Sequence, residues 1–252
     1  MPHNIRIIPR LDIKGPNLVK GIHLEGIRVL GKPEDFARNY YKAGADELIY
    51  MDVVASLYNR NNLFHLIEKA CEEIFIPLTM GGGLRTISDI EKALRAGADK
   101  VAINTQAIKT PNFIKEASRI FGSQCIVGSV EAKRKGDSWE AYIDSGREPT
   151  GVNVLEWVKQ MEDLGAGEIL LTSVDQEGTK KGFDIDLMKK VADRVSIPVI
   201  ASGGAGSPEQ INDLIQQSGV NAVAVASILH YNISSIPGIK DCLNRNRVEV
   251  RM

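Results

Sequence analysis

An internal repeat constrains the fold of this chain more strongly than any other feature of its sequence. Residues 7–14 form a short apolar run that ends in an acid-x-Lys tripeptide, and residues 126–133 repeat this pattern half a chain later. Gly82-Gly83 recurs as Gly203-Gly204, at an offset of 203 − 82 = 121 residues. The chain therefore consists of two halves of one design, about residues 1–122 and 123–252.

Each half contains four units in which an apolar strand is followed by a helix. Such alternation predicts an all-parallel sheet. Eight units in 252 residues match the size of a closed (β/α)8 barrel. We therefore predict an α/β fold in which residues 1–252 form a single TIM barrel with a half-barrel internal repeat.

The expected elements follow from apolar runs, glycine stops and helix caps. Strands are expected to end at 12 and 52 and to cover 76–80, 100–103, 126–131, 168–172, 197–201 and 222–225. Helices are expected at about 33–44, 61–73, 88–96, 111–121 and 153–164, before 194, from 207, and at the end of the chain. Either Thr86 or Ser88 caps the helix that starts near residue 88.

Two segments interrupt this alternation. Residues 15–31 show no convincing periodicity, and so long a loop in a compact barrel is often a mobile lid. The alternative is a flexible surface insertion. Residues 133–151 form an irregular arm, in which residues 139–143 are expected to form one strand of a small β-hairpin outside the barrel.

Composition excludes several classes of function. The net charge of −1 argues against a general binding surface for nucleic acid or an anionic membrane. No apolar run is long enough for a membrane span, and the charged N-terminus shows no signal peptide. Three scattered cysteines favour a reducing cytoplasm, and they form no ligand cluster with the four histidines. We expect no metal and no cofactor.

Glycine-rich turns supply candidate phosphate sites. Glycine lets backbone N–H groups approach an anion closely, although such turns can also be merely tight. Barrels of this kind often bind phosphate at the turns after strands seven and eight, where Gly203-Gly204 and Ala226-Ser227 lie. The repeat places Gly82-Gly83 and Asn104-Thr105 on the opposite side of the same face. Two facing anion sites predict a ligand with a phosphate at each end.

Asp12 and Glu131 are the candidate catalytic pair. They end the first and fifth strands, which face each other across an eight-stranded barrel. Two carboxylates on opposite walls can act as general acid and general base on a ligand between them. The alternative is that each acid forms a structural ion pair with a nearby lysine, such as Lys14 or Lys133.

With the strand ends assigned, the chain resembles the cyclase subunit (HisF type) of imidazole glycerol phosphate synthase over essentially its whole length. Ten sequence blocks in the same order carry this resemblance. They are Leu11-Asp12, Val19-Lys20-Gly21, Asp46-Glu47-Leu48, Gly81-Gly82-Gly83, residues 97–101, Ile103-Asn104-Thr105, residues 121–124, residues 165–173, residues 201–206 and Ala226-Ser227.

The resemblance implies a reaction in histidine biosynthesis. A glutaminase subunit (HisH type) in a heterodimer would release ammonia, which passes through the barrel to a bisphosphorylated ribulosyl intermediate. Cleavage and ring closure would then yield imidazole glycerol phosphate and an aminoimidazole carboxamide ribotide.

The resemblance also implies a role for individual residues. Asp12 and Glu131 would be catalytic, Lys20 would be the lid lysine, and Asp99 would face the partner. Substrate and its phosphates would contact Lys20, Gly82, Gly83, Asn104, Thr105, Thr172, Glu177, Gly178, Ser202, Gly203, Gly204, Ala226 and Ser227. Arg6, Glu47, Lys100 and Glu168 would form the ammonia gate, and two acids with two bases are also physically suited to a closed salt-bridge ring.

Two departures from the family pattern bear on activity. Glu131 and Glu177 stand where the family has aspartate, and an extra methylene moves a carboxylate by roughly an ångström, which can cost on the order of a hundredfold in rate. Residues 8–11 and 131–133 look closer to a paralogous branch found with surface-polysaccharide (LPS) genes.

Three hypotheses are therefore open. The first is a synthase subunit that uses Asp12 and Glu131 on the ribulosyl substrate. The second, in line with the paralogous branch, is a phosphate-binding conduit with little or no cyclase activity, which passes ammonia to a sugar amidotransferase. The third is the related isomerase of the same pathway, which shares the barrel and its phosphate turns but has no need of four gate charges.

Overall fold

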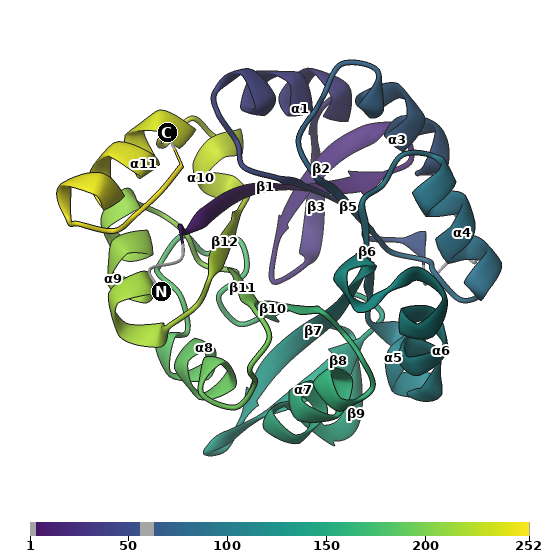
Figure 1. Cartoon of the computed structure of the whole chain (residues 1–252). Helices are drawn as coiled ribbons and strands as arrows, with labels where there is room; N and C mark the ends of the chain where they lie inside the picture. Colours follow the sequence, from purple (N-terminus) through teal and green to yellow (C-terminus); the bar gives the residue numbers. More distant parts are fainter. Residues whose placement is uncertain (1–3, 56–62, 252) are drawn as a thin grey trace.

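The computed structural model describes residues 4–55 and 63–251 as a closed barrel of eight parallel strands (Figure 1). In order round the barrel these are β1 (Arg6–Lys14), β4 (Leu48–Asp52), β5 (Leu78–Gly81), β6 (Lys100–Ile103), β7 (Ile126–Lys135), β10 (Glu168–Ser173), β11 (Val199–Ser202) and β12 (Ala222–Val225). Pairing of β7 with β10 and of β12 with β1 closes the sheet. The predicted (β/α)8 barrel is confirmed.

Helices connect these strands and form an outer ring around them (Figure 1). They are α1 (Pro33–Lys42), α3 (Phe64–Cys71), α4 (Ile87–Arg95), α6 (Asn112–Phe121), α7 (Val154–Asp163), α8 (Ile185–Ala192), α9 (Pro208–Ser218) and α11 (Ile236–Arg245). The start expected for α3, near residue 61, lies outside the described residues. Two short helices that were not predicted, α5 (Thr105–Lys109) and α10 (Ser227–His230), follow β6 and β12 directly.

Caps fix where several of these helices begin. Thr86 accepts a hydrogen bond from the backbone N–H of Asp89, whose side chain in turn accepts one from the Thr86 N–H, so α4 starts with a complete capping box. Ser207 caps α9 ahead of Pro208, and Asn153 caps α7. These local signals set the lengths of the loops that connect helices to the barrel.

Residues on each barrel strand alternate between two hydrophobic cores. Inside the barrel lies a compact apolar layer made of Ile8, Ile49, Ala102, Val127, Leu170, Ile200, Ala222 and Ala224. The larger core fills the space between the outer face of the strands and the helices. On β1 this alternation turns Arg6, Ile8, Arg10 and Asp12 inward, because their spacing is two residues.

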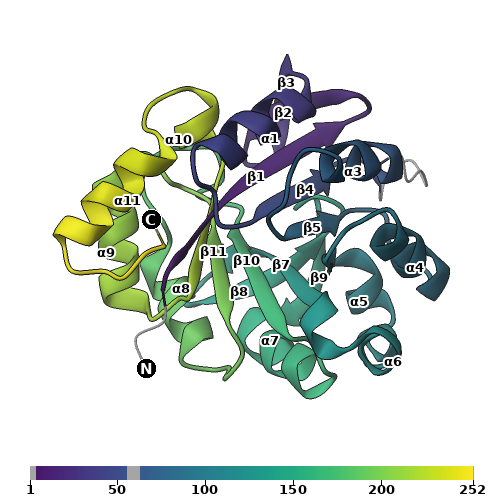
Figure 2. The ribbon, with the colours of Figure 1, turned by 45° about the horizontal axis from the view of Figure 1, so that its top comes forward.

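The prediction of an irregular loop over residues 15–31 is wrong. This segment forms an antiparallel hairpin of β2 (Asn17–Ile22) and β3 (Glu25–Gly31), and β2 pairs with β1. Figure 2 shows the hairpin extending beyond the barrel end of β1. Pairing with β2 also carries β1 two residues beyond its predicted end, to Lys14. The pattern was hidden because β3 is largely exposed and the β2–β3 register is irregular.

A second hairpin follows β7. It consists of β8 (Ser138–Ile143) and β9 (Glu148–Asn153), which confirms the strand predicted at 139–143. The first strand of each half therefore carries a hairpin at its carboxyl end, β1 in one half and β7 in the other. The division into half-barrels near residue 122 stays a prediction, and this equivalence supports it.

Two further findings concern the described part of the chain. No helix there is both long enough and apolar enough to cross a membrane. Within residues 4–55 and 63–251, no group of three or more His, Cys, Asp or Glu side chains could hold a metal ion.

Candidate active site

A cavity opens at the carboxyl ends of β4, β5, β6 and β7. Its volume is about 970 Å³, including space open to solvent. Residues from seven parts of the chain line it, among them Arg10, Gly82, Gly83, Asn104, Thr105 and Glu131. The cavity thus brings together one predicted phosphate turn and one predicted catalytic acid, at the end of the barrel where barrel enzymes keep their active sites.

Asp12 and Glu131 lie on opposite walls, because β1 and β7 are four strands apart in either direction round the barrel. The two carboxylates have different surroundings. Asp12 accepts hydrogen bonds from Arg10 Nε at 2.9 Å and Lys20 Nζ at 3.0 Å. Glu131 accepts one from the backbone N–H of Gly146 at 2.8 Å, in the turn between β8 and β9.

These surroundings separate the protonation states of the pair. Burial by itself raises the pKa of Asp12, but the positive charges of Arg10 and Lys20 outweigh burial and lower it to about 2. Burial raises the pKa of Glu131 to about 7, against the smaller opposing effects of the Gly146 hydrogen bond and the Arg10 charge. At neutral pH, Asp12 is therefore a carboxylate, whereas Glu131 is close to its pKa and can either hold or release a proton.

The alternative in which Lys14 and Lys133 pair with the two acids does not describe the structure. Lys14 is exposed at the end of β1, and Lys133 Nζ lies 4.5 Å from the centre of the Tyr142 ring. Asp12 is ion-paired, but with Arg10 and Lys20. Among residues 4–55 and 63–251, no cation lies within ion-pair distance of Glu131.

Lys20 is delivered to this site by the hairpin. It lies on β2, is 2% exposed, and bridges the carboxylates of Asp12 and Glu177. Burial lowers the pKa of Lys20, but the two carboxylates raise it more, so the ammonium ion is retained. The backbone N–H of His23 also donates to the carbonyl of Glu177 at 2.8 Å. The hairpin is therefore docked onto the loop after β10.

The first predicted phosphate turn is also in contact with the second hairpin. Asn104 Nδ2 donates to the carbonyl oxygen of Tyr142 at 3.1 Å, and Thr105 Oγ1 accepts from the N–H of Asp144 at 3.3 Å. Gly82 and Gly83 complete this wall of the cavity. The β8–β9 hairpin thus contacts both the predicted phosphate turn, through Asn104 and Thr105, and Glu131, through Gly146.

The second predicted phosphate turn lines a smaller hollow of about 260 Å³ at the ends of β10, β11 and β12. Its lining includes Glu177, Gly178, Ser202, Gly203, Gly204, Ala226 and Ser227. A Cβ atom on Gly204 would lie 1.9 Å from the carbonyl oxygen of Gly182, so no side chain fits there. A Cβ on Gly178 would lie 2.3 Å from the carbonyl oxygen of Gly21, which shows how closely the β2–β3 hairpin covers this hollow.

Arg10 is a site residue that the sequence reasoning missed. Its Nη1 donates to Thr172 Oγ1 at 2.9 Å and to Ser202 Oγ at 3.3 Å, and these are two of the predicted substrate contacts. A signal was available, because Arg10 is two residues before Asp12 and so faces the same side of a strand. A charged residue inside a predicted barrel marks it as part of the site.

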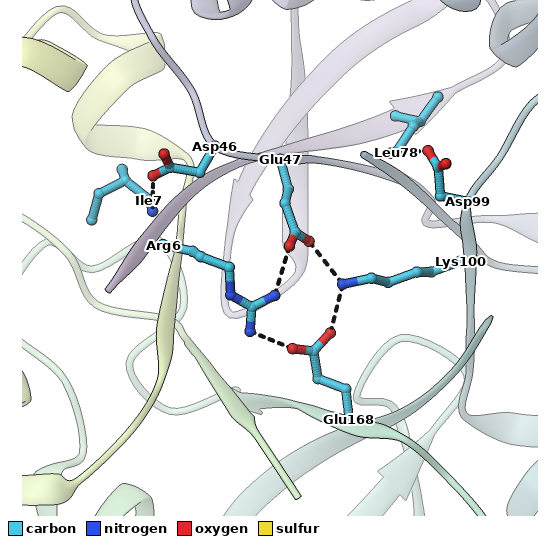
Figure 3. A network of polar contacts seen from close by, with 8 residues as sticks. All are labelled: Arg6, Ile7, Asp46, Glu47, Leu78, Asp99, Lys100 and Glu168. Atoms are coloured by element: carbon cyan, nitrogen blue, oxygen red, sulfur yellow. Dashed lines mark hydrogen bonds and ion pairs between the residues drawn. The ribbon is translucent and has the colours of Figure 1, made fainter. Parts of the chain in front are cut away.

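A closed ring of four charges lies at the opposite end of the barrel (Figure 3). Glu47 accepts from Arg6 Nη1 at 2.7 Å and from Lys100 Nζ at 3.1 Å. Glu168 accepts from Lys100 Nζ at 3.0 Å and from Arg6 Nη2. Each charge therefore has two partners of opposite sign. Asp99, beside Lys100, is exposed, and its carboxylate accepts a hydrogen bond from the backbone N–H of Leu78 at 2.8 Å.

Fold and site together define a (β/α)8-barrel protein with two carboxylates facing each other between glycine-rich turns. The sequence model of the family described as histidine biosynthesis protein matches residues 6–235. The imidazole glycerol phosphate synthase subunit HisF of Legionella pneumophila is 60% identical over 210 residues, which are 83% of this chain and 99% of that protein.

Two strains of Dehalococcoides mccartyi, BAV1 and CBDB1, have proteins of the same name. Each is 45% identical to this chain over 249 residues, covering 99% of this chain and 98% of the relative. The chain belongs to the histidine biosynthesis protein family, and its likeness to HisF-type cyclase subunits extends over nearly its whole length.

Proposed function

We propose that this protein is the cyclase subunit of imidazole glycerol phosphate synthase. It would use ammonia to convert the ribulosyl bisphosphate intermediate into imidazole glycerol phosphate and aminoimidazole carboxamide ribotide. The observation that carries the proposal is the pair Asp12 and Glu131, held on opposite walls between two glycine-rich turns. A ligand with a phosphate at each end would then lie between an acid and a base.

The separated pKa values support a different role for each carboxylate. Asp12, with its pKa lowered to about 2, is ionised at neutral pH and would act as the base. Glu131, with its pKa of about 7, can hold a proton and give it to a leaving group as the general acid. Lys20 would keep Asp12 charged and, through the hairpin, close the site over the ligand.

The ammonia source would be a glutaminase subunit of the HisH type, in a heterodimer. The relatives are named as subunits of a synthase, which supports a partner chain. We place its docking face at the amino-terminal end of the barrel, where Asp99 is exposed and the four-charge ring lies (Figure 3). Ammonia would enter through this ring, and because the ring is closed by ion pairs, one pair must part for it to pass.

The other hypotheses have less support. The comparisons give none to a surface-polysaccharide role or to a sugar amidotransferase partner, because the relatives above carry the synthase name. The related isomerase has no need of a four-charge ring, which this barrel contains. Action in the cytoplasm stays a prediction.

Turnover with an ammonium salt tests the proposal without the partner. The purified protein should release the carboxamide ribotide from the ribulosyl bisphosphate intermediate in the presence of ammonium chloride. Asp12→Asn should lower kcat/KM by about a hundredfold or more, which is typical of losing a general base. Asp137→Asn, at an exposed turn after β7, is the control and should leave turnover unchanged. A folded wild-type protein that binds the substrate but leaves it unaltered would refute the proposal.

A further inference from the structure

Arg10 lies inside the barrel on β1, between the apolar layer and Asp12 at the mouth. Moving along β1 towards the mouth, the inward side chains are Arg6 in the four-charge ring, Ile8 in the apolar layer, Arg10 and then Asp12. The Arg10 residue is 3% exposed. A buried guanidinium is costly unless its hydrogen bonds are satisfied. Arg10 meets this requirement with contacts that all belong to the candidate site.

The contacts of Arg10 connect three strands. Its Nε donates to Asp12 Oδ1 at 2.9 Å on β1, and its Nη1 donates to Thr172 Oγ1 on β10 and Ser202 Oγ on β11. Ser202 lines the second hollow, whereas Arg10 itself lines the first cavity. Arg10 therefore separates the two predicted phosphate turns and braces Asp12 between them.

Arg10 also acts electrostatically on both carboxylates. Its charge lowers the pKa of Asp12 through direct contact and that of Glu131 through space. The other charged groups that face Glu131 are Asp12 from β1 and Asp144 from the β8–β9 turn. Two further groups face Asp12. They are Lys20 from β2, which also pairs with Glu177, and His230 of α10.

We propose that Arg10 is a positioning residue, which fixes the orientation of Asp12 towards the ligand and places its positive charge within reach of both carboxylates. This inference rests on the proposed function for its chemical purpose. It goes further by assigning to a residue outside the predicted carboxylate pair the orientation of Asp12 and an influence on the titration of Glu131. Arg10 acts through Asp12 and Glu131 and needs no contact with the substrate.

Titration of Glu131 tests the inference without any turnover. In protein labelled with ¹³C at the glutamate carboxyl, the Glu131 signal can be assigned from its loss in Glu131→Gln. Arg10→Met should raise the midpoint pH of that signal by about one unit, because the cation that favours the carboxylate is gone. Arg134→Met removes an exposed arginine of β7 only three residues from Glu131 and should leave the midpoint unchanged.

Two additional variants keep the test decisive. If Arg10→Met does not fold, Arg10→Gln removes the same charge with less loss of hydrogen bonding, and the same rise is expected. Arg10→Lys keeps the charge but loses the forked geometry. It should keep the midpoint near the wild-type value while lowering kcat of the ammonium-dependent reaction at least tenfold.

A midpoint that stays at the wild-type value in Arg10→Met or Arg10→Gln would overturn the inference and leave Arg10 a merely structural residue. This outcome differs from failure of the proposed function. In that case wild type would show no turnover, and the Glu131 midpoint would still respond to Arg10.

Discussion

At the residue scale, Asp12 and Glu131 carry the same functional group in different surroundings. Asp12 is neutralised by two buried cations, whereas the structure gives Glu131 one backbone hydrogen bond and the more distant charge of Arg10. Different environments rather than different side chains therefore distinguish the two roles that we propose. The same arrangement makes the pH dependence of the reaction predictable.

We expect kcat/KM for the ammonium-dependent reaction to fall as pH rises above about 7, where Glu131 loses its proton. The ammonia concentration must be held constant across the series, because ammonium itself titrates. Glu131→Gln should remove this limb together with most of the activity. A wild-type profile that rises steadily through pH 7 would instead make Glu131 a base.

The raised pKa of Glu131 also has a consequence for stability. Its ordinary value is 4.5 and its value in the folded protein is about 7, so the folded state retains a proton that the unfolded chain loses. The contribution of Glu131 to the free energy of unfolding therefore decreases as pH rises through that window. In urea unfolding, the free energy of unfolding should decrease less between about pH 5 and about pH 7 for Glu131→Gln than for wild type.

At the element scale, the two hairpins contact the residues at the mouth of the barrel and fix their positions. The β2–β3 hairpin brings Lys20 to Asp12 and covers Gly178, and the β8–β9 hairpin contacts Glu131, Asn104 and Thr105. Neither hairpin belongs to the eight-unit repeat of strand and helix. The barrel positions the carboxylates, and these additions determine their surroundings.

The second phosphate turn can be tested at Gly204. A Cβ there would lie 1.9 Å from the Gly182 carbonyl oxygen, so Gly204→Ala should displace the turn and weaken binding of inorganic phosphate at least tenfold by calorimetry. Gly136→Ala is the matched control, because Gly136 also has a positive φ, of +61°, but has open space around it. Equal phosphate affinity in Gly204→Ala and wild type would place phosphate elsewhere.

The cap of α4 provides a test of local structure. Sequence reasoning left Thr86 and Ser88 as alternatives, and the structure gives the capping box to Thr86. Thr86→Ala should lower the free energy of unfolding by about 1 kcal/mol. Ser88→Ala should change it by less than about 0.5 kcal/mol, since Ser88 is exposed. Equal losses in the two variants would contradict this assignment.

At the scale of the whole molecule, the barrel keeps two charged regions apart. The four-charge ring is at one end, the carboxylate pair is at the other, and the apolar layer that includes Ile8 and Leu170 lies between them. A neutral molecule such as ammonia can cross an apolar layer far more easily than an ion can. This separation would suit the passage of ammonia that we propose.

Lys100→Met should destabilise the protein, because it leaves Glu47 and Glu168 to share Arg6 alone. Partly buried pairs of this kind lie between the exposed and fully buried cases, so we expect a loss of about 2 kcal/mol in urea unfolding. Arg95→Met, which breaks the exposed pair with Glu91, should cost less than about 0.5 kcal/mol. A loss in Lys100→Met no larger than in Arg95→Met would show that the ring adds nothing to stability.

Periodic parts of the architecture were predictable from the sequence. Eight apolar runs gave the barrel strands, and the repeat gave the opposed positions of Asp12 and Glu131. The β2–β3 hairpin was not predictable, because its outer strand buries little and so carries no apolar alternation. The short helices α5 and α10 are too brief for a helical period to show.

Side-chain partners in the site depended on contacts between distant segments. Lys20 could be placed near a ligand, but its bridge between Asp12 and Glu177 follows from a hairpin that the sequence did not reveal. Strand alternation alone would have placed Arg10 on the same side of β1 as Asp12. Arg10 was not predicted as a site residue, because an arginine inside a barrel contradicts the expectation of an apolar interior. Residues that break the local pattern are often the functional ones.

The most direct test of the central claim compares wild type, Glu131→Asp and Glu131→Gln in turnover of the ribulosyl bisphosphate intermediate with ammonium chloride. We predict turnover by wild type, measurable turnover by Glu131→Asp, and a loss of about a hundredfold or more in Glu131→Gln. Absence of turnover in folded wild type, together with activity in Glu131→Asp, would contradict the claim that Glu131 is the working acid of a cyclase.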